Sequence, residues 1–131
     1  MITTISVALN EYRLGGTLEF LNVGSGVAHI LIYDSARPAN GAAITTETLL
    51  VDVPLLDPPG TVGSNKLSIT TPPDALILAS GIAAWARVIN GDGSHAIDCD
   101  VTDIAGAGPI KMASTTLYAG GIARILSAEF S

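Results

Sequence analysis

The sequence has few charged side chains, and most of its charge is of one sign. Charged residues make up 14% of the 131 positions, against roughly 25% in typical soluble domains, and the formal net charge is −6. The basic residues are scattered singly: Arg13, Arg37, Lys66, Arg87, Lys111 and Arg124. Because phosphate backbones and anionic membrane surfaces are bound by clustered Lys and Arg, the sequence predicts neither a nucleic-acid nor a membrane partner.

Cysteine is nearly absent, and long hydrophobic runs are missing. Cys99 is the single cysteine, so the chain forms no internal disulfide. The longest apolar run, residues 75–86, is interrupted by Ser80 and Gly81 and is too short to cross a bilayer. The opening residues lack a basic stretch and include Glu11, which predicts no signal peptide and a protein made in the cytoplasm.

Aromatic residues are also scarce, although the chain is hydrophobic. They make up 5% of the residues against 48% hydrophobic residues in total, so the apolar mass is aliphatic. The positive mean hydropathy, +0.49, is unusual in a chain of single-domain size, because small domains have the most surface to cover. We therefore expect much of the surface to consist of Gly, Ser, Thr and Ala, and neighbouring subunits to cover part of it in a homo-oligomer.

Short runs with β-strand character fill the chain after residue 22. They are separated by turns rich in Gly and Pro, and a new run begins about every 10 to 14 residues. This spacing predicts a mainly β fold, a single β-sandwich or jelly-roll domain over residues 23–131. The predicted strands are 27–34, 46–56, 66–70, 82–90, 95–103, 110–119 and 122–130, with a further buried run near 74–79, a loop at 35–43 and a long turn at 57–65.

Residues 1–22 are predicted to form a helix or an arm outside this domain. Ile5, Leu9 and Tyr12, continued by Leu18 and Leu21, recur at helical steps, and Thr3 or Thr4 would cap the helix. Gly15-Gly16 weakens a helix. The alternative is a pair of strands, "TISVAL" and "TLEFLNV", joined by a turn at these glycines.

Residues 85–101 read "WARVINGDGSHAIDCDV" and contain the strongest hairpin signal. Two alternating runs flank "NGDGS", and Asn-Gly and Asp-Gly favour tight hairpin turns. Oxygen-bearing side chains gather here, namely Asn90, Asp92, Asp98, Asp100 and Asp103, but glycine and glutamate are missing from the positions that an EF-hand requires. We expect Asp98 and Asp100 to share a solvated strand face, with Ile97, Cys99 and Val101 toward the core.

The alternative for this segment is a weak divalent-cation site that involves Asp92, Asp98 or Asp100. A second alternative is a dyad of Cys99 with a histidine, although a thiol that points into the core is inert. We expect His29 to be hydrogen-bonded in the core or an interface, and His95 to be exposed in the hairpin. Since no spacing matches a catalytic, cofactor or metal motif, we predict no enzyme, no cofactor, no site residues and no metal requirement for folding.

Several segments together resemble a family of small proteins of tailed bacteriophages. The segments are "ILIYDSARPANGAA", "TLLVDVPL", "SGIAAWARVINGDGSHAIDCDV" and "LYAGGIARILSAEF". The family shares an I-Y-x-x-x-R-P segment, an A-x-W-x-R strand that ends in a D-G turn, and a closing A-G-G-x-x-x-I strand. The likeness extends from about residue 27 to the C-terminus, and its motifs are folding motifs. Trp85, between small alanines, is expected to anchor the core beside the closing strand.

The resemblance implies a structural component of the virion, produced in the host cytoplasm. Its favoured role is a capsid decoration (cement) protein that binds the major capsid protein or other virion proteins non-covalently, through residues 1–22 or the loops 35–43 and 57–65. A tail or neck component is the alternative. A receptor-binding module ranks lowest, because aromatic side chains are thinly spread.

Overall fold

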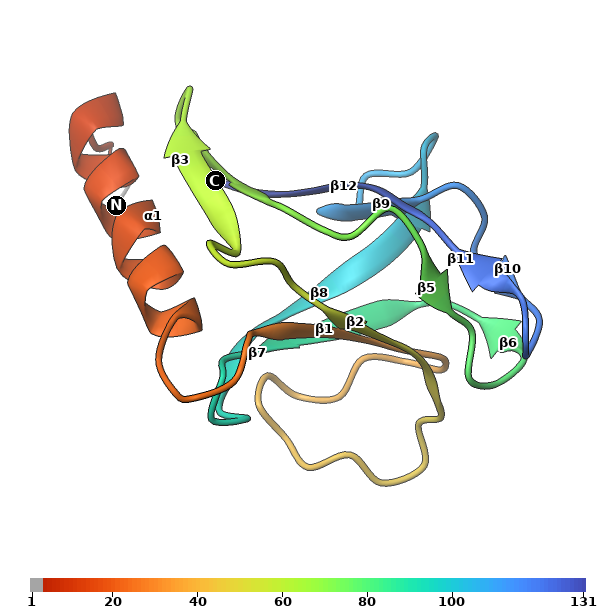
Figure 1. The fold of residues 1–131 in the computed structure, drawn as a ribbon. Helices are drawn as coiled ribbons and strands as arrows, with labels where there is room; N and C mark the ends of the chain where they lie inside the picture. Colours follow the sequence, from red (N-terminus) through yellow and green to blue (C-terminus); the bar gives the residue numbers. More distant parts are fainter. Residues whose placement is uncertain (1–3) are drawn as a thin grey trace.

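The computed structural model describes residues 4–131, which form a mainly β fold with 40% strand and a single helix in that range (Figure 1). Eight strands form one curled sheet in the order β2-β1-β7-β8-β9-β12-β4-β3. Their bounds are β1 His29–Tyr33, β2 Leu49–Pro54, β3 Gly60–Gly63, β4 Lys66–Ile69, β7 Trp85–Ile89, β8 His95–Asp103, β9 Ile110–Met112 and β12 Ile125–Phe130. The predicted β-sandwich-like fold with one N-terminal helix is confirmed.

Four very short strands form two further sheets at one end of the domain (Figure 1). One pairs β10 (Thr116–Leu117) with β6 (Gly81–Ile82), and the other pairs β11 (Ile122–Ala123) with β5 (Ala75–Leu76). Within the second pair, Ile122 lies directly opposite Leu76. This end of the molecule lies opposite the helix (Figure 1).

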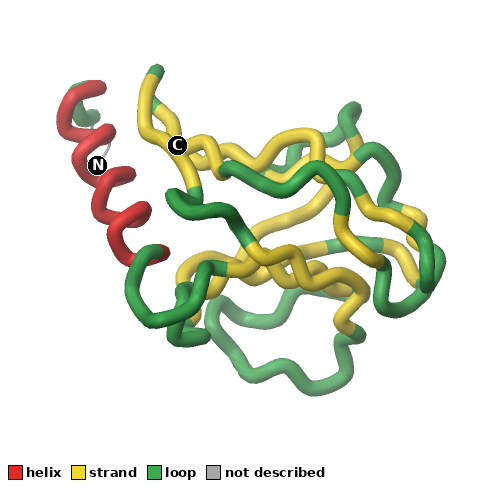
Figure 2. The backbone as a smooth tube through the Cα atoms, viewed as in Figure 1, coloured by secondary structure: helices red, strands yellow, loops and turns green. Residues whose placement is uncertain are grey.

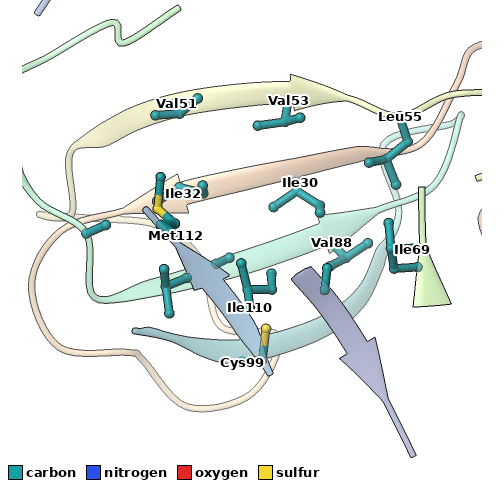
Figure 3. Packing of buried hydrophobic residues seen from close by; sticks show 14 of the residues in the cluster. Ile30, Ile32, Val51, Val53, Leu55, Ile69, Val88, Cys99, Ile110 and Met112 are labelled. Carbon is teal, nitrogen blue, oxygen red and sulfur yellow. The ribbon is translucent and has the colours of Figure 1, made fainter. Parts of the chain in front are cut away.

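The hydrophobic core is aliphatic and lies inside the curl of the large sheet (Figure 3). Ile30 and Ile32 on β1 and Val88 on β7 alternate with outward-facing neighbours, as the period of two in a strand requires. Ile110 and Met112 on β9 enter the same core from the other half of the sheet (Figure 3). The parallel pair β8 and β9, with Val101 opposite Ile110, joins the two halves.

Helix α1 spans Val7–Leu21, so the two-strand alternative is wrong. Ser6, rather than Thr4, caps the helix, because its Oγ accepts a hydrogen bond of 3.0 Å from the Leu9 amide; Thr3 lies outside the described residues. The helix runs through Gly15-Gly16 without interruption.

The helix packs on its own domain, against β3, β4 and β8. Leu14 and Leu21 are buried, and Leu18 lies partly buried between them on the same helix face. Asn10 Nδ2 also donates to Asn65 Oδ1 at 2.7 Å. The inner face of the segment is therefore occupied, and only its outer face is free to contact another protein.

Three expectations about the connecting segments are corrected. The predicted long turn 57–65 contains β3, and only Ser64 and Asn65, both with positive φ, form the turn between β3 and β4. The run 74–79 is not a buried strand, because Leu76 and Leu78 face solvent on either side of the buried Ile77. The loop after β1 extends over residues 34–48, longer than predicted, and forms a wide excursion beside the sheet (Figure 2).

Candidate functional site

The hairpin between β7 and β8 forms as predicted, with Asn90 to Ser94 as its turn. Gly93 has φ +82°, and a Cβ on Gly91 would collide with the Gly26 carbonyl. The buried Asn90 side chain accepts hydrogen bonds from the Asp92 amide at 3.0 Å and the Ser94 amide at 2.9 Å. Asn90 therefore organises the turn, which occupies its carbonyl oxygen.

The acidic cluster separates into different environments, and the expected solvated position of Asp98 is wrong. Asp98 is buried beside Arg87, whose Nε donates to Oδ1 at 2.8 Å and whose Nη2 donates to Oδ2 at 3.0 Å. Asp100, two residues along the same strand, remains exposed, as predicted. Asp92 lies in the turn, and Asp103 ends β8, where its Oδ1 accepts from the Ala105 amide at 3.0 Å.

The loop 34–48 explains the burial of Asp98, because the loop crosses the outer face of β8. The Gly41 amide donates to Asp98 Oδ2 at 2.9 Å, and Arg37 Nη1 donates to the Asp98 carbonyl at 3.2 Å. Arg37 Nε also lies 3.5 Å from Asp100 Oδ1. Asp98 thus anchors both the sheet and the loop, and its carboxylate is saturated by protein donors.

The charges on this face perturb one another. Burial acts to raise the pKa of Asp98, but the hydrogen bonds from Arg87 and from the Gly41 amide outweigh it and hold the pKa below its usual value. The hydrogen bond to Asp98 in turn raises the pKa of Arg87. Both groups are therefore charged at neutral pH, as a structural ion pair.

Trp85 is fully buried, as predicted, but it does not lie beside the closing strand. Its strand, β7, pairs with β1 and β8, and its ring stacks on Tyr33 with 4.7 Å between ring centroids and 17° between planes. Trp85 Nε1 donates to the Asp34 carbonyl at 3.1 Å, and the Arg87 guanidinium lies 5.5 Å from the ring centroid. We call Tyr33, Trp85, Arg87 and Asp98, beneath residues 34–48, the covered face.

The covered face brings together the motifs on which the family resemblance rests. Tyr33 and Arg37 belong to the I-Y-x-x-x-R-P segment, and Trp85 and Arg87 belong to the A-x-W-x-R strand. In the fold the first pair meets the second through the ring stack and through the shared contacts with Asp98. These residues therefore build the domain.

The remaining reactive side chains lie apart from one another. Cys99 points into the aliphatic core (Figure 3), where burial raises the pKa of its thiol to about 12. His29 is half-buried, with Nδ1 2.6 Å from Asp52 Oδ1, as the expected hydrogen bonding requires. Among residues 4–131 no group of three or more His, Cys, Asp and Glu side chains is placed to hold a metal ion.

His95 is not exposed as expected. It begins β8, where its Nε2 faces Asp98 Oδ1 at 3.2 Å without the alignment of a hydrogen bond. The loop 34–48 also shields it, because a Cβ on Gly41 would lie 3.6 Å from the imidazole ring. The independence of folding from metal stays a prediction. A melting curve recorded with and without a chelator would check it.

Large apolar side chains gather on the surface at the end formed by β5, β6, β10 and β11. We call this surface the short-strand end, and define it by Leu76, Leu78, Ile82, Tyr118 and Ile122. Their exposed fractions run from 51% for Leu78 to 70% for Tyr118. Sequence reasoning missed this surface, because Leu76, Ile77 and Leu78 are all apolar, so their pattern does not show which face of the run is exposed.

A second exposed surface is the outer face of α1. A shallow groove there is lined by Ala8, Glu11, Tyr12, Gly15, Gly16 and Glu19. Tyr12 is 83% exposed, and Val7 and Leu9 are each about half exposed near it on the first turns of the helix. Apart from the neighbouring backbone of the helix itself, a Cβ on either glycine would meet no atom of the described chain within 4 Å.

Comparisons with protein-family models, with curated proteins and with solved structures found no match to this chain. Within the described residues, the structure contains no helix with the length and apolar character to cross a membrane.

Proposed function

We propose that this protein is a structural component of a bacteriophage particle, a capsid decoration protein that stabilises the shell by non-covalent binding. The observation that carries the proposal is that the exposed apolar side chains include one group on α1 and another on the short strands, and these elements lie at opposite ends of the domain (Figure 1). Exposed apolar patches mark protein contact sites. A domain with two such ends is suited to link neighbouring proteins on a repetitive surface, and the family resemblance supplies the phage context.

A non-enzymatic role is part of the proposal. Two of the side chains that could perform chemistry are engaged in the fold: Cys99 is in the core, and Asp98 is held by Arg87. A nucleophile or general base needs an accessible position and a partner that activates it. These arrangements support binding, rather than catalysis, as the activity of the domain.

The outer face of α1 is the proposed contact with the shell. Two adjacent glycines cost a helix roughly 2 kcal/mol relative to alanines, yet no packing within the chain requires them. Their absent side chains leave the helix backbone open to close approach, between Tyr12 and the carboxylates of Glu11 and Glu19. This combination suits a segment of the capsid protein that carries an apolar side chain next to Lys or Arg.

Particle binding tests this contact. Purified protein is added to particles that lack it, and the bound amount is measured by co-sedimentation. Tyr12→Ser with Leu9→Ser should reduce occupancy at least tenfold, since exposed interface anchors contribute more than about 1.4 kcal/mol together. Ile104→Ser, which alters an equally apolar exposed side chain in the β8–β9 turn, is the matched control.

Point variants are preferable to deletion of residues 1–22, because deletion would also uncover the surface that Leu14 and Leu21 bury. If the variant with Tyr12→Ser and Leu9→Ser still binds particles at full occupancy, the contact is not on α1. The loops 35–43 and 57–65 are then the next candidates. The number of copies per particle, counted by mass spectrometry, distinguishes the roles. Hundreds of copies support decoration of the shell, whereas about a dozen or fewer support the tail or neck alternative.

A further inference from the structure

The five side chains that define the short-strand end are all uncharged. Leu76 and Ile122 face each other across the β5–β11 pair, and Ile82 lies on β6, which pairs with β10 just before Tyr118. Asp34 lies beside Gly81 of β6, where its Oδ1 accepts a hydrogen bond from the Thr48 amide. The other charged groups near this end are Arg124 and Asp74, whose Nη2 and Oδ1 atoms lie 3.4 Å apart. Both side chains are at least half exposed, so they form part of the rim.

We infer that the short-strand end binds a second copy of this chain. The inference goes beyond the proposed function: it takes up the homo-oligomer expected from the composition and names the surface through which that oligomer forms. Every one of the five defining side chains is more than half exposed in the single chain. No residue of the described chain covers them.

Electrostatics favours a second copy at this end over the helix end. Two copies with a net charge of −6 each repel, so they meet at lowest cost where no unpaired carboxylate enters the contact. The groove on α1 contains Glu11 and Glu19, which would face like charges if two helices met there. The five side chains that define the short-strand end are uncharged, so no such repulsion arises between them.

The rim supplies charge complementarity for a two-fold arrangement. In a two-fold interface both chains use the same patch. If one residue of the first chain contacts a second residue of the other chain, the reciprocal contact forms as well. Arg124 of one copy can then approach Asp74 of the other, and the reverse pair forms by symmetry. Both pairs lie at the edge of the contact, where they set register without the desolvation cost of a buried pair.

The exposed apolar side chains supply a large share of the area that such a contact needs. A standard interface buries about 800 Å² on each partner. Five large side chains, each more than half exposed, supply on the order of half of that area. The short connections between the strands, with Ala79, Ala119 and Gly120, add backbone and small side chains without charge.

Sedimentation equilibrium of the purified protein tests the inference without any particle. The wild-type chain should form a dimer at micromolar concentration, and Ile82→Ser with Ile122→Ser should raise the dissociation constant at least tenfold. Leu9→Ser, at the opposite end of the molecule, is the matched control and should leave the constant unchanged. Melting temperatures confirm that each variant is folded.

The rim gives a second, independent test. Arg124→Asp should weaken association by placing two carboxylates against each other, and Asp74→Arg in the same chain should restore it. A monomeric wild-type chain, or association that the Ile82 and Ile122 variant leaves unchanged, would overturn the inference. Since these measurements use pure protein, their failure is separate from a failure of particle binding.

Discussion

Two regions of this domain carry large apolar side chains outside the aliphatic core, and they differ in what lies over them. On the covered face, Trp85 and Tyr33 stack beneath residues 34–48 and are almost completely buried. At the short-strand end, side chains such as Tyr118 and Ile122 are exposed by more than 60%. A 15-residue loop thus covers one region, whereas no segment of the described chain covers the other in the same way.

The difference separates residues that build the fold from residues that are available for binding. The free energy gained from burying Trp85 contributes to folding of the single chain. The exposed area of Ile122 contributes little to folding, so its burial remains available to drive association. Substitutions on the covered face should therefore affect stability, whereas substitutions at the short-strand end should affect association and leave stability nearly unchanged.

Trp85→Ala should have the largest effect on the free energy of unfolding. Truncation of a fully buried aromatic ring removes its transfer free energy and leaves a cavity, at a cost of about 3–5 kcal/mol. Tyr118→Ala, an aromatic truncation at the short-strand end, is the comparison and should cost less than about 0.5 kcal/mol. Urea denaturation measures both, and equal losses would erase the distinction between the two regions.

Asp98→Ala should have an effect nearly as large. The substitution leaves the Arg87 guanidinium buried without its partner and removes the acceptor of the Gly41 amide, which costs about 3 kcal/mol. Asp100→Ala, on the same strand but exposed, should cost under about 1 kcal/mol. A small effect at Asp98 would show that the loop 34–48 is held by other contacts.

Acid should weaken the covered face through Asp98. Because the pKa of Asp98 is lower in the folded chain than its usual value, its contribution is present above about pH 4 and is lost as pH falls through the folded pKa. Urea midpoints between pH 2 and pH 7 should fall at the acid end, and Asp98→Asn should flatten part of that fall. Identical profiles for the two proteins would contradict the assignment.

Gly16→Ala should produce the smallest change, and in the opposite direction. Apart from the neighbouring backbone of the helix itself, no atom of the described chain lies within 4 Å of the added Cβ, so the substitution should stabilise α1 by about 0.5–1 kcal/mol. If the outer face of α1 contacts the shell, the same variant should bind particles more weakly although it is more stable. If the variant gains both stability and affinity for particles, the outer face of α1 does not form the contact.

Much of the fold could be predicted from local patterns. Alternation located β1 and β8, and the Asn-Gly and Asp-Gly dipeptides located the hairpin between β7 and β8. The helical periodicity of residues 5–21 predicts α1, but it does not show that Ser6 is the cap. β3 was missed because its four residues begin and end with glycine, so they read as a turn.

The covered face was beyond prediction for a different reason. Alternation shows that Trp85 and Arg87 share one face of a strand, but it cannot show which face a distant loop will cover. Asp98 was expected in water because carboxylates are seldom buried, and its burial depends on Arg87, Gly41 and Arg37, which come from two other segments. The short-strand end was missed for the converse reason, since an apolar run suggests burial.

Amide hydrogen exchange at two protein concentrations tests the central claim most directly, because it reports which surface becomes covered when chains associate. Exchange is compared under monomeric, nanomolar conditions and at tens of micromolar. Our account predicts that residues 75–82 and 116–123 become more protected at the higher concentration, while residues 34–48 and α1 do not change. Added protection in α1 or in the loop, with none at the short-strand end, would contradict it.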